Sequence, residues 1–238
     1  LVGDVPRGVM LREQRIFLGG QGGLVGPVSI DYGTVLAAGF VYRLDHGPDE
    51  LVVGEKLVPR TLSFDPRRYS RIRAKVERNL RYIGNLAALW HWYETVRTRC
   101  AAGDAERTQL HGRARDLLRG GIGERVKRLG QVAGYMEPSI AVLEAEGTRG
   151  AEIAAQRAFA DGWPRMERAL LDVASLEPRE GAQQRAVLER GVDAALQQAG
   201  EGGYLAVIRG LSTEAREAGT RWLQAIVDHT IALGRPSS

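Results

Sequence analysis

Four cations at helical spacing are the first residues whose types and arrangement can do chemistry. Arg67, Arg71, Lys75 and Arg78 are separated by four, four and three residues, which places them on one face of an α-helix. Guanidinium and ammonium groups gathered there can clamp a phosphate-bearing ligand, such as the 3′-phosphate of coenzyme A or a sugar nucleotide. The alternative is a solvated face that keeps the helix soluble. Residues 64–100 hold nine Lys or Arg against three Asp or Glu, so we expect any anionic partner to meet this segment.

A general base for group transfer is the second chemical requirement, and histidine is its usual source near neutral pH. His46 is the only histidine in the first third of the chain, so it is the one catalytic candidate, although a lone histidine in a turn is more often structural. His91, His111 and His229 are too far apart for metal-ligand spacing, and no metal site is expected. Cys100 is the single cysteine, which excludes an internal disulfide and favours a half-buried packing role.

Two further motifs favour structure over chemistry. The Gly-rich run at 19–23 is followed by Leu-Val-Gly-Pro, without the helix start that a phosphate-binding loop needs. The aromatic run at 90–93 (Trp-His-Trp-Tyr) lies within a helical pattern and favours packing over stacking on a base. Nucleic-acid binding is the least favoured interpretation, because Tyr69 and Tyr82 are the only aromatic residues near the cations.

The elements that must position these residues differ along the chain, and the first of them has a period of six. Aliphatic residues recur at this spacing from residue 18 to residue 36: Leu18, Leu24, Ile30 and Leu36. Their spacing predicts short strands that stack one aliphatic side chain each into an inward ladder. An amphipathic helix would repeat every three to four residues, and a Gly-rich sheet edge is the remaining alternative.

This pattern resembles the hexapeptide-repeat, left-handed β-helix family, and Asp4-Val5-Pro6 looks like a segment that often follows a coil in that family. The resemblance covers about residues 1–45. Among family members the chain is most similar to the C-terminal part of bacterial UDP-N-acetylglucosamine pyrophosphorylase/acetyltransferase-like proteins. It implies terminal coils of a left-handed parallel β-helix, a homotrimer, and use of acetyl-coenzyme A or of UTP with Mg by the full-length protein. No cofactor is expected within this chain, because the catalytic residues of that family have no match here.

The remainder predicts a helical bundle. Asp65-Pro66 is a typical helix start, and apolar residues then step by three or four toward residue 101. Further helices are predicted at 104–119, 123–135, 138–146, 149–175 with a break near 162–164, 179–199, 204–209 and 212–233, where Ser212 is the expected cap. The expected division is therefore coils at 1–45, an extended connector at 46–65 and an α-helical domain at 66–238.

Composition limits the functional hypotheses. The 238 residues contain no apolar run of membrane-spanning length and no basic-then-apolar signal segment, so we expect a cytoplasmic protein that does not bind membranes. A β-helix needs several coils, so we expect the chain to be the C-terminal piece of a longer protein. The first hypothesis is part of a nucleotidyltransferase or acyltransferase that supplies trimerisation and part of a site for a sugar phosphate or nucleotide sugar. The alternative is a non-catalytic module for oligomerisation or scaffolding, with a helical interaction domain.

Overall fold

The computed structural model describes residues 1–55, 59, 61, 64–147, 150–200 and 203–235. The chain divides into two compact units, Leu1–Ser63 and Phe64–Ser238, which are called the small unit and the helical unit below. Part of the expected connector, at 56–58, 60 and 62–63, lies outside the described residues. No helix among the described residues is both long and apolar enough to cross a lipid bilayer.

The small unit has five strands of two residues each, in two small parallel sheets. The first sheet has the order β1 (Phe17–Leu18), β3 (Val35–Leu36) and β5 (Leu51–Val52), and the second pairs β2 (Gly23–Leu24) with β4 (Val41–Tyr42). A single helical turn, α1 (Val5–Gly8), precedes them, and the Asp4 carboxylate caps it by accepting a hydrogen bond from the Arg7 amide at 2.8 Å.

The prediction of a left-handed β-helix is wrong. The described residues form neither a closed barrel nor a solenoid of strands, and the protein is 66% helical. The expected ladder also forms only in part: Ile30 and Leu36 are buried, whereas the exposed fractions of Leu18 and Leu24 are 47% and 38%. A spacing of six therefore placed aliphatic residues on short strands, but it did not place all four of them in one core.

The core of the small unit is correspondingly small. Val28, Ile30, Leu36 and Tyr42 pack together in it. The Tyr42 hydroxyl donates to the backbone carbonyls of Ala37 at 2.8 Å or Val52 at 3.1 Å, which satisfies its polar end. Order elsewhere in this unit comes from backbone hydrogen bonds between neighbouring segments and from side-chain contacts to the backbone.

The first long helix begins later than its sequence suggests. α2 spans Ile72–Trp92 and continues into a π-helical stretch, η1 (Tyr93–Arg97), and α3 (Thr98–Cys100). Arg71 has a φ of 55°, in the left-handed region, which separates α2 from the turn at Pro66. The Asp65 carboxylate caps only that turn, at the Arg67 amide. The Ile72 amide donates instead to Glu152 at 3.1 Å, so a side chain of another helix caps α2.

The remaining helices are longer and fewer than glycine and proline predict. They are α4 (Ala105–Gly134), α5 (Met136–Ala145), α6 (Ala151–Leu171), α7 (Ala182–Ala199), α8 (Gly203–Gly210) and α9 (Thr213–Ala232), with short 3₁₀ turns at Val173–Leu176 and Arg179–Gly181. The breaks expected near residue 121 in α4 and near Pro164 in α6 are absent. Buried side chains on both sides of each break, such as Ile122 in α4 and Met166 in α6, offset the local penalty. The predicted cap of α9 is confirmed, since Ser212 Oγ accepts from the Ala215 amide at 3.2 Å.

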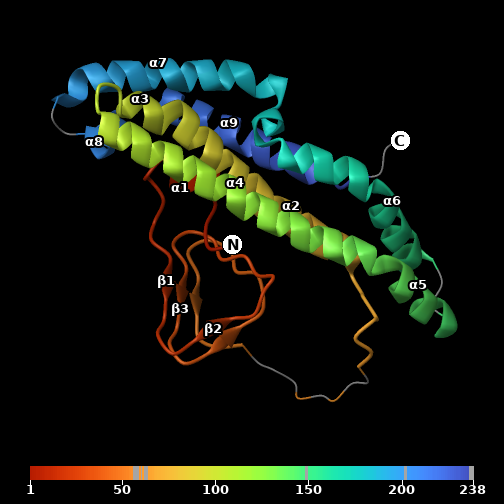
Figure 1. Ribbon diagram of the computed structural model, residues 1–238. Helices are drawn as coiled ribbons and strands as arrows, with labels where there is room; N and C mark the ends of the chain where they lie inside the picture. Colours follow the sequence, from red (N-terminus) through yellow and green to blue (C-terminus); the bar gives the residue numbers. More distant parts are fainter. Residues whose placement is uncertain (56–58, 60, 62–63, 148–149, 201–202, 236–238) are drawn as a thin grey trace. The chain divides into compact units, whose positions relative to one another are not determined.

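The helical unit is a bundle whose centre is α2. This helix packs against α4, α6 and α9, while α7 packs on α9 (Figure 1). Trp92, Trp222, Leu80 and Leu170 are among its largest fully buried side chains. The predicted helical bundle is therefore present, and α2 carries two of the four cations that the sequence singled out for chemistry, Lys75 and Arg78.

Candidate functional site

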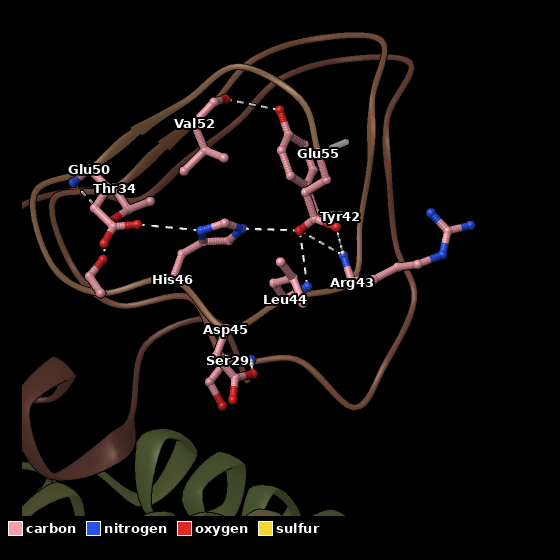
Figure 2. Close-up of polar contacts among 11 residues, drawn as sticks. Ser29, Thr34, Tyr42, Arg43, Leu44, Asp45, His46, Glu50, Val52 and Glu55 are labelled. Atoms are coloured by element: carbon pink, nitrogen blue, oxygen red, sulfur yellow. Dashed lines mark hydrogen bonds and ion pairs between the residues drawn. The ribbon is translucent and has the colours of Figure 1, made fainter. Parts of the chain in front are cut away.

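The first candidate site surrounds His46 in the small unit (Figure 2). Nδ1 of His46 lies 3.3 Å from a Glu50 carboxylate oxygen, and Nε2 lies 3.2 Å from a Glu55 carboxylate oxygen. Glu55 also accepts hydrogen bonds from the backbone amides of Arg43 and Leu44, at 2.8 to 2.9 Å. The side chains of His46 and Glu55 are 11% and 5% exposed, whereas that of Glu50 is 48% exposed. His46 is therefore held between a buried and an exposed carboxylate.

This geometry disfavours His46 as a general base. A base must present a free nitrogen to the proton that it removes, and both ring nitrogens of His46 face carboxylates. Burial raises the pKa of Glu55, but hydrogen bonds from Leu44, Arg43 and His46 outweigh it and hold the pKa below its ordinary value. Glu55 is thus an ionised anchor that joins the backbone at 43 and 44 to the imidazole.

A metal ion does not fit this cluster. Donors already occupy the Glu55 oxygens, and a metal ligand must offer free lone pairs. Among the described residues, no group of three or more His, Cys, Asp or Glu side chains is arranged to hold a metal ion.

The four predicted cations do not form a single face. Arg67 precedes α2 and pairs with Asp65 at 2.7 Å, and these hydrogen bonds lower the pKa of Asp65 to about 2. Arg71 lies at the left-handed residue before the helix, so only Lys75 and Arg78 lie within α2. The ammonium of Lys75 lies over the ring of Tyr69, 5.4 Å from its centroid. The four charges of the expected phosphate clamp therefore lie partly before α2 and partly within it, not along one helix face.

The aromatic residues near these cations are also engaged. Tyr69 stacks on Tyr135 with ring centroids 6.2 Å apart, and Arg125 covers Tyr82 at 4.8 Å. Each of these two rings therefore has a face that is already covered, which leaves less aromatic surface on which a base can stack. Nucleic-acid binding remains the least favoured interpretation of the basic segment.

The second candidate site is a groove of about 700 Å³ between α2, α6 and the end of α9. Apolar side chains from all three elements form its floor: Ile72, Val76, Leu80, Phe159, Met166, Ile231 and Leu233. Its volume lies within the range of about 300 to 1,000 Å³ that small-molecule sites occupy. This groove will be called the α2/α6/α9 groove.

Charged residues form the rim of this groove. Arg73, Arg165 and Arg235 face Glu77 and Asp161 there, and all five are exposed. Glu77 is already paired with Arg81 at 3.0 Å. Arg73 makes no ion pair with any residue that the structure describes, and Arg165 donates only to the Arg235 carbonyl, at 3.4 Å. The rim therefore offers more unpaired positive than negative charge.

Comparison with known proteins adds no relative. No protein-family model, curated protein or solved structure matches the chain. The resemblance to the hexapeptide-repeat family and the transferase function that it implies therefore stay predictions.

The sequence predicted only the residues that α2 contributes to the groove. The apolar face of α2 was predicted, and Ile72, Val76 and Leu80 belong to it. Phe159 on α6 and Leu233 after α9 lie about 80 to 160 residues away, and no spacing rule connects them to α2. In the structure, a Cβ added at Gly162 would meet no atom within 4 Å, so α6 leaves open space toward this groove.

Proposed function

We propose that the helical unit is a non-catalytic ligand-binding module, and that the α2/α6/α9 groove takes an amphipathic small molecule with a carboxylate head. One observation carries this proposal: an apolar floor from three helices adjoins a rim with unpaired guanidinium groups. Ligand sites typically combine an apolar lining with a few polar groups that fix the orientation. An alkyl chain suits the floor, and a carboxylate suits Arg73 or Arg235 through charge-assisted hydrogen bonds.

The catalytic candidates among the described residues are poorly placed for catalysis, which favours a binding role. His46 has both nitrogens engaged, and Cys100 is half-buried with its pKa raised by burial, which disfavours the reactive thiolate. This supports the non-catalytic alternative that the sequence left open. The hypothesis that this chain is part of a sugar-nucleotide transferase remains separate. It predicts a different ligand, a sugar phosphate bound near Arg71 and Lys75.

Titration calorimetry with decanoate tests the proposal. Gly162→Met fills the groove where a new side chain meets no atom, so we expect at least a tenfold loss of affinity with the fold retained. Gly112→Met in α4 is the matched control, because that glycine also has open space around it but lies outside the groove. Arg73→Gln is expected to weaken binding by about tenfold, the loss of roughly one charge-assisted bond.

Two outcomes would overturn the binding proposal: no heat with decanoate, or equal affinity in Gly162→Met and the unchanged protein. UDP-N-acetylglucosamine and acetyl-coenzyme A serve as the competing probes. Binding of either one that is lost in an Arg71→Ala, Lys75→Ala double variant would support the transferase hypothesis instead.

A further inference from the structure

One face of α4 is exposed along most of the helix. Eight residues with alternating spacings of four and three form this α4 stripe: Glu106, Leu110, Arg113, Leu117, Gly120, Glu124, Lys127 and Gln131. The opposite face carries buried residues such as Ile122 and Val126. The helix itself packs against α2 in the bundle (Figure 1). Leu110 and Leu117 on this face are 63% and 78% exposed, so both are accessible to a partner.

The α4 stripe is complementary to itself when reversed. In an antiparallel pair of these helices, centred between Leu117 and Gly120, Arg113 faces Glu124 of the second copy and Glu124 faces Arg113 of the second copy. Leu117 likewise faces Gly120 of the second copy. A two-fold axis repeats each of these contacts, which is the property of an isologous interface.

The shapes fit as well as the charges. Gly120 has no side chain, and an added Cβ would meet no atom within 4 Å, so a leucine from a second helix has room there. The next outer pair sets Leu110 against Lys127, whose alkyl stem can cover the leucine while its ammonium reaches toward Glu106. A hollow of about 530 Å³ that Glu106, Leu110 and Arg113 help to line lies at this end of the stripe.

Arg113, the cation at the centre of the proposed charge pairs, has no competing ion pair among the described residues. Glu124 does pair with Arg128 at 2.8 Å, one turn along α4, but both side chains are more than half exposed, so this pair is worth little.

We propose that the α4 stripe is a docking surface for a second copy of this chain, paired antiparallel about a two-fold axis. The occupant follows from the order of residues: the positions of Arg113 and Glu124, and of Leu117 and Gly120, exchange on reversal of the helix. A partner of another sequence would need no such symmetry.

Charge reversal tests this pairing with sedimentation velocity over a concentration series. The unchanged chain of 26.0 kDa is expected to reach the mass of two chains. Arg113→Glu sets two carboxylates against each other, and Glu124→Arg sets two guanidinium groups against each other, so each variant alone is expected to associate at least tenfold more weakly. An equimolar mixture of the two variants restores both opposite-charge pairs and is expected to recover the dimer. The double variant in one chain is expected to recover it too.

The controls separate pairing from folding. Arg221→Glu on α9 makes the same change of charge away from the stripe and is expected to leave the mass unchanged, and circular dichroism checks the helix content of every variant. Three results would overturn the proposal: a monomer at all concentrations, a trimer, or a dimer that neither single reversal weakens.

Discussion

The two units of this chain are ordered by different means. In the small unit, the main core cluster has four buried side chains, and the backbone is held by hydrogen bonds between two-residue parallel strands. In the helical unit, long helices satisfy their own backbones, and packing of large side chains such as Trp92 and Trp222 fixes the tertiary arrangement. The same deletion of buried volume should therefore remove a larger share of the stability of the small unit.

The histidines illustrate the difference. His46 in the small unit contacts two carboxylates. His91 in the helical unit is buried beside Trp90, and its Nε2 lies 3.1 Å from the Val173 carbonyl. Burial lowers the pKa of His91, and Arg185 adds to this effect, while the charge of Glu177 opposes it. Burial therefore outweighs the neighbouring carboxylate of Glu177 and favours the neutral form of His91.

The largest expected effect is in the helical unit. Trp222→Ala removes a fully buried ring and its hydrogen bond to Glu177, and it should lower the free energy of unfolding by about 3 to 5 kcal/mol. All four tryptophans lie in the helical unit, so their fluorescence in urea reports this unit alone. Arg221→Ala, the exposed neighbour, should change it by less than about 0.5 kcal/mol. Equal losses in both variants would contradict the packing described for Trp222.

A similar truncation sharpens the comparison in the small unit. Ile30 bridges Val2 and His46 in parallel pairing and is 1% exposed. Ile30→Ala should cost about 2 to 5 kcal/mol, and with so small a core it should unfold the unit. Hydrogen exchange at the amides of Val35 and Ala37 is the readout, while tryptophan fluorescence should stay unchanged. A fluorescence change of the same size would mean that the two units unfold together.

Acid should weaken the small unit through Glu55. The pKa of this carboxyl is lowered in the folded chain, so its contribution is present above its ordinary value of 4.5 and is lost as the pH falls through the folded value. Glu55→Gln should therefore be less stable at neutral pH and should lose less stability on acidification. Hydrogen exchange of Arg43 and Leu44 between pH 6 and 3 measures this. Glu50→Gln is the control, because that carboxylate is half exposed and receives no backbone hydrogen bond from residues 43 and 44.

The smallest expected effect concerns a helix cap. Ser212→Ala removes the acceptor for the Ala215 amide at the start of α9 and should cost about 1 kcal/mol in the helical unit. Ser212→Asp should restore most of this loss, because an aspartate accepts the same bond. Urea unfolding monitored by fluorescence distinguishes the two, and equal stability of the alanine and aspartate variants would argue against the cap.

Local patterns predicted the helical unit well where side-chain periodicity decides structure. The apolar positions of α2 and the cap at Ser212 followed from rules that act within one or two turns. The start of α2 did not, because Glu152 from a distant helix caps Ile72. Glycine and proline in α4 and α6 suggested breaks, but packing against neighbouring helices outweighed these local preferences.

The small unit shows the limit of a short period. Six-residue spacing identified the segments that pair, but the exposure of Leu18 and Leu24 depends on what packs above each strand. His46 was the one catalytic candidate, and the structure sets both of its ring nitrogens against carboxylates. The role of Glu55 was not predicted, since nothing in its sequence context marks the amides at 43 and 44 as its partners. The α4 stripe became visible only when residues 105–134 proved to be one continuous helix.

The parallel pairing of the small unit has a consequence for the order of folding during synthesis. Phe17 pairs with Val35, Gly23 with Val41, and Val35 with Leu51, so each pair joins segments that are 16 or 18 residues apart. A hairpin can nucleate locally. Each of these parallel pairs instead requires closure of a longer loop, and the entropy lost in that closure precedes the first stabilising contact. The last of these pairs ends at residue 52, ahead of Ile72 at the start of α2, so on a ribosome it leaves the exit tunnel before α2 does. The small unit can therefore complete its pairing without the helical unit, which makes it a separate early folding step.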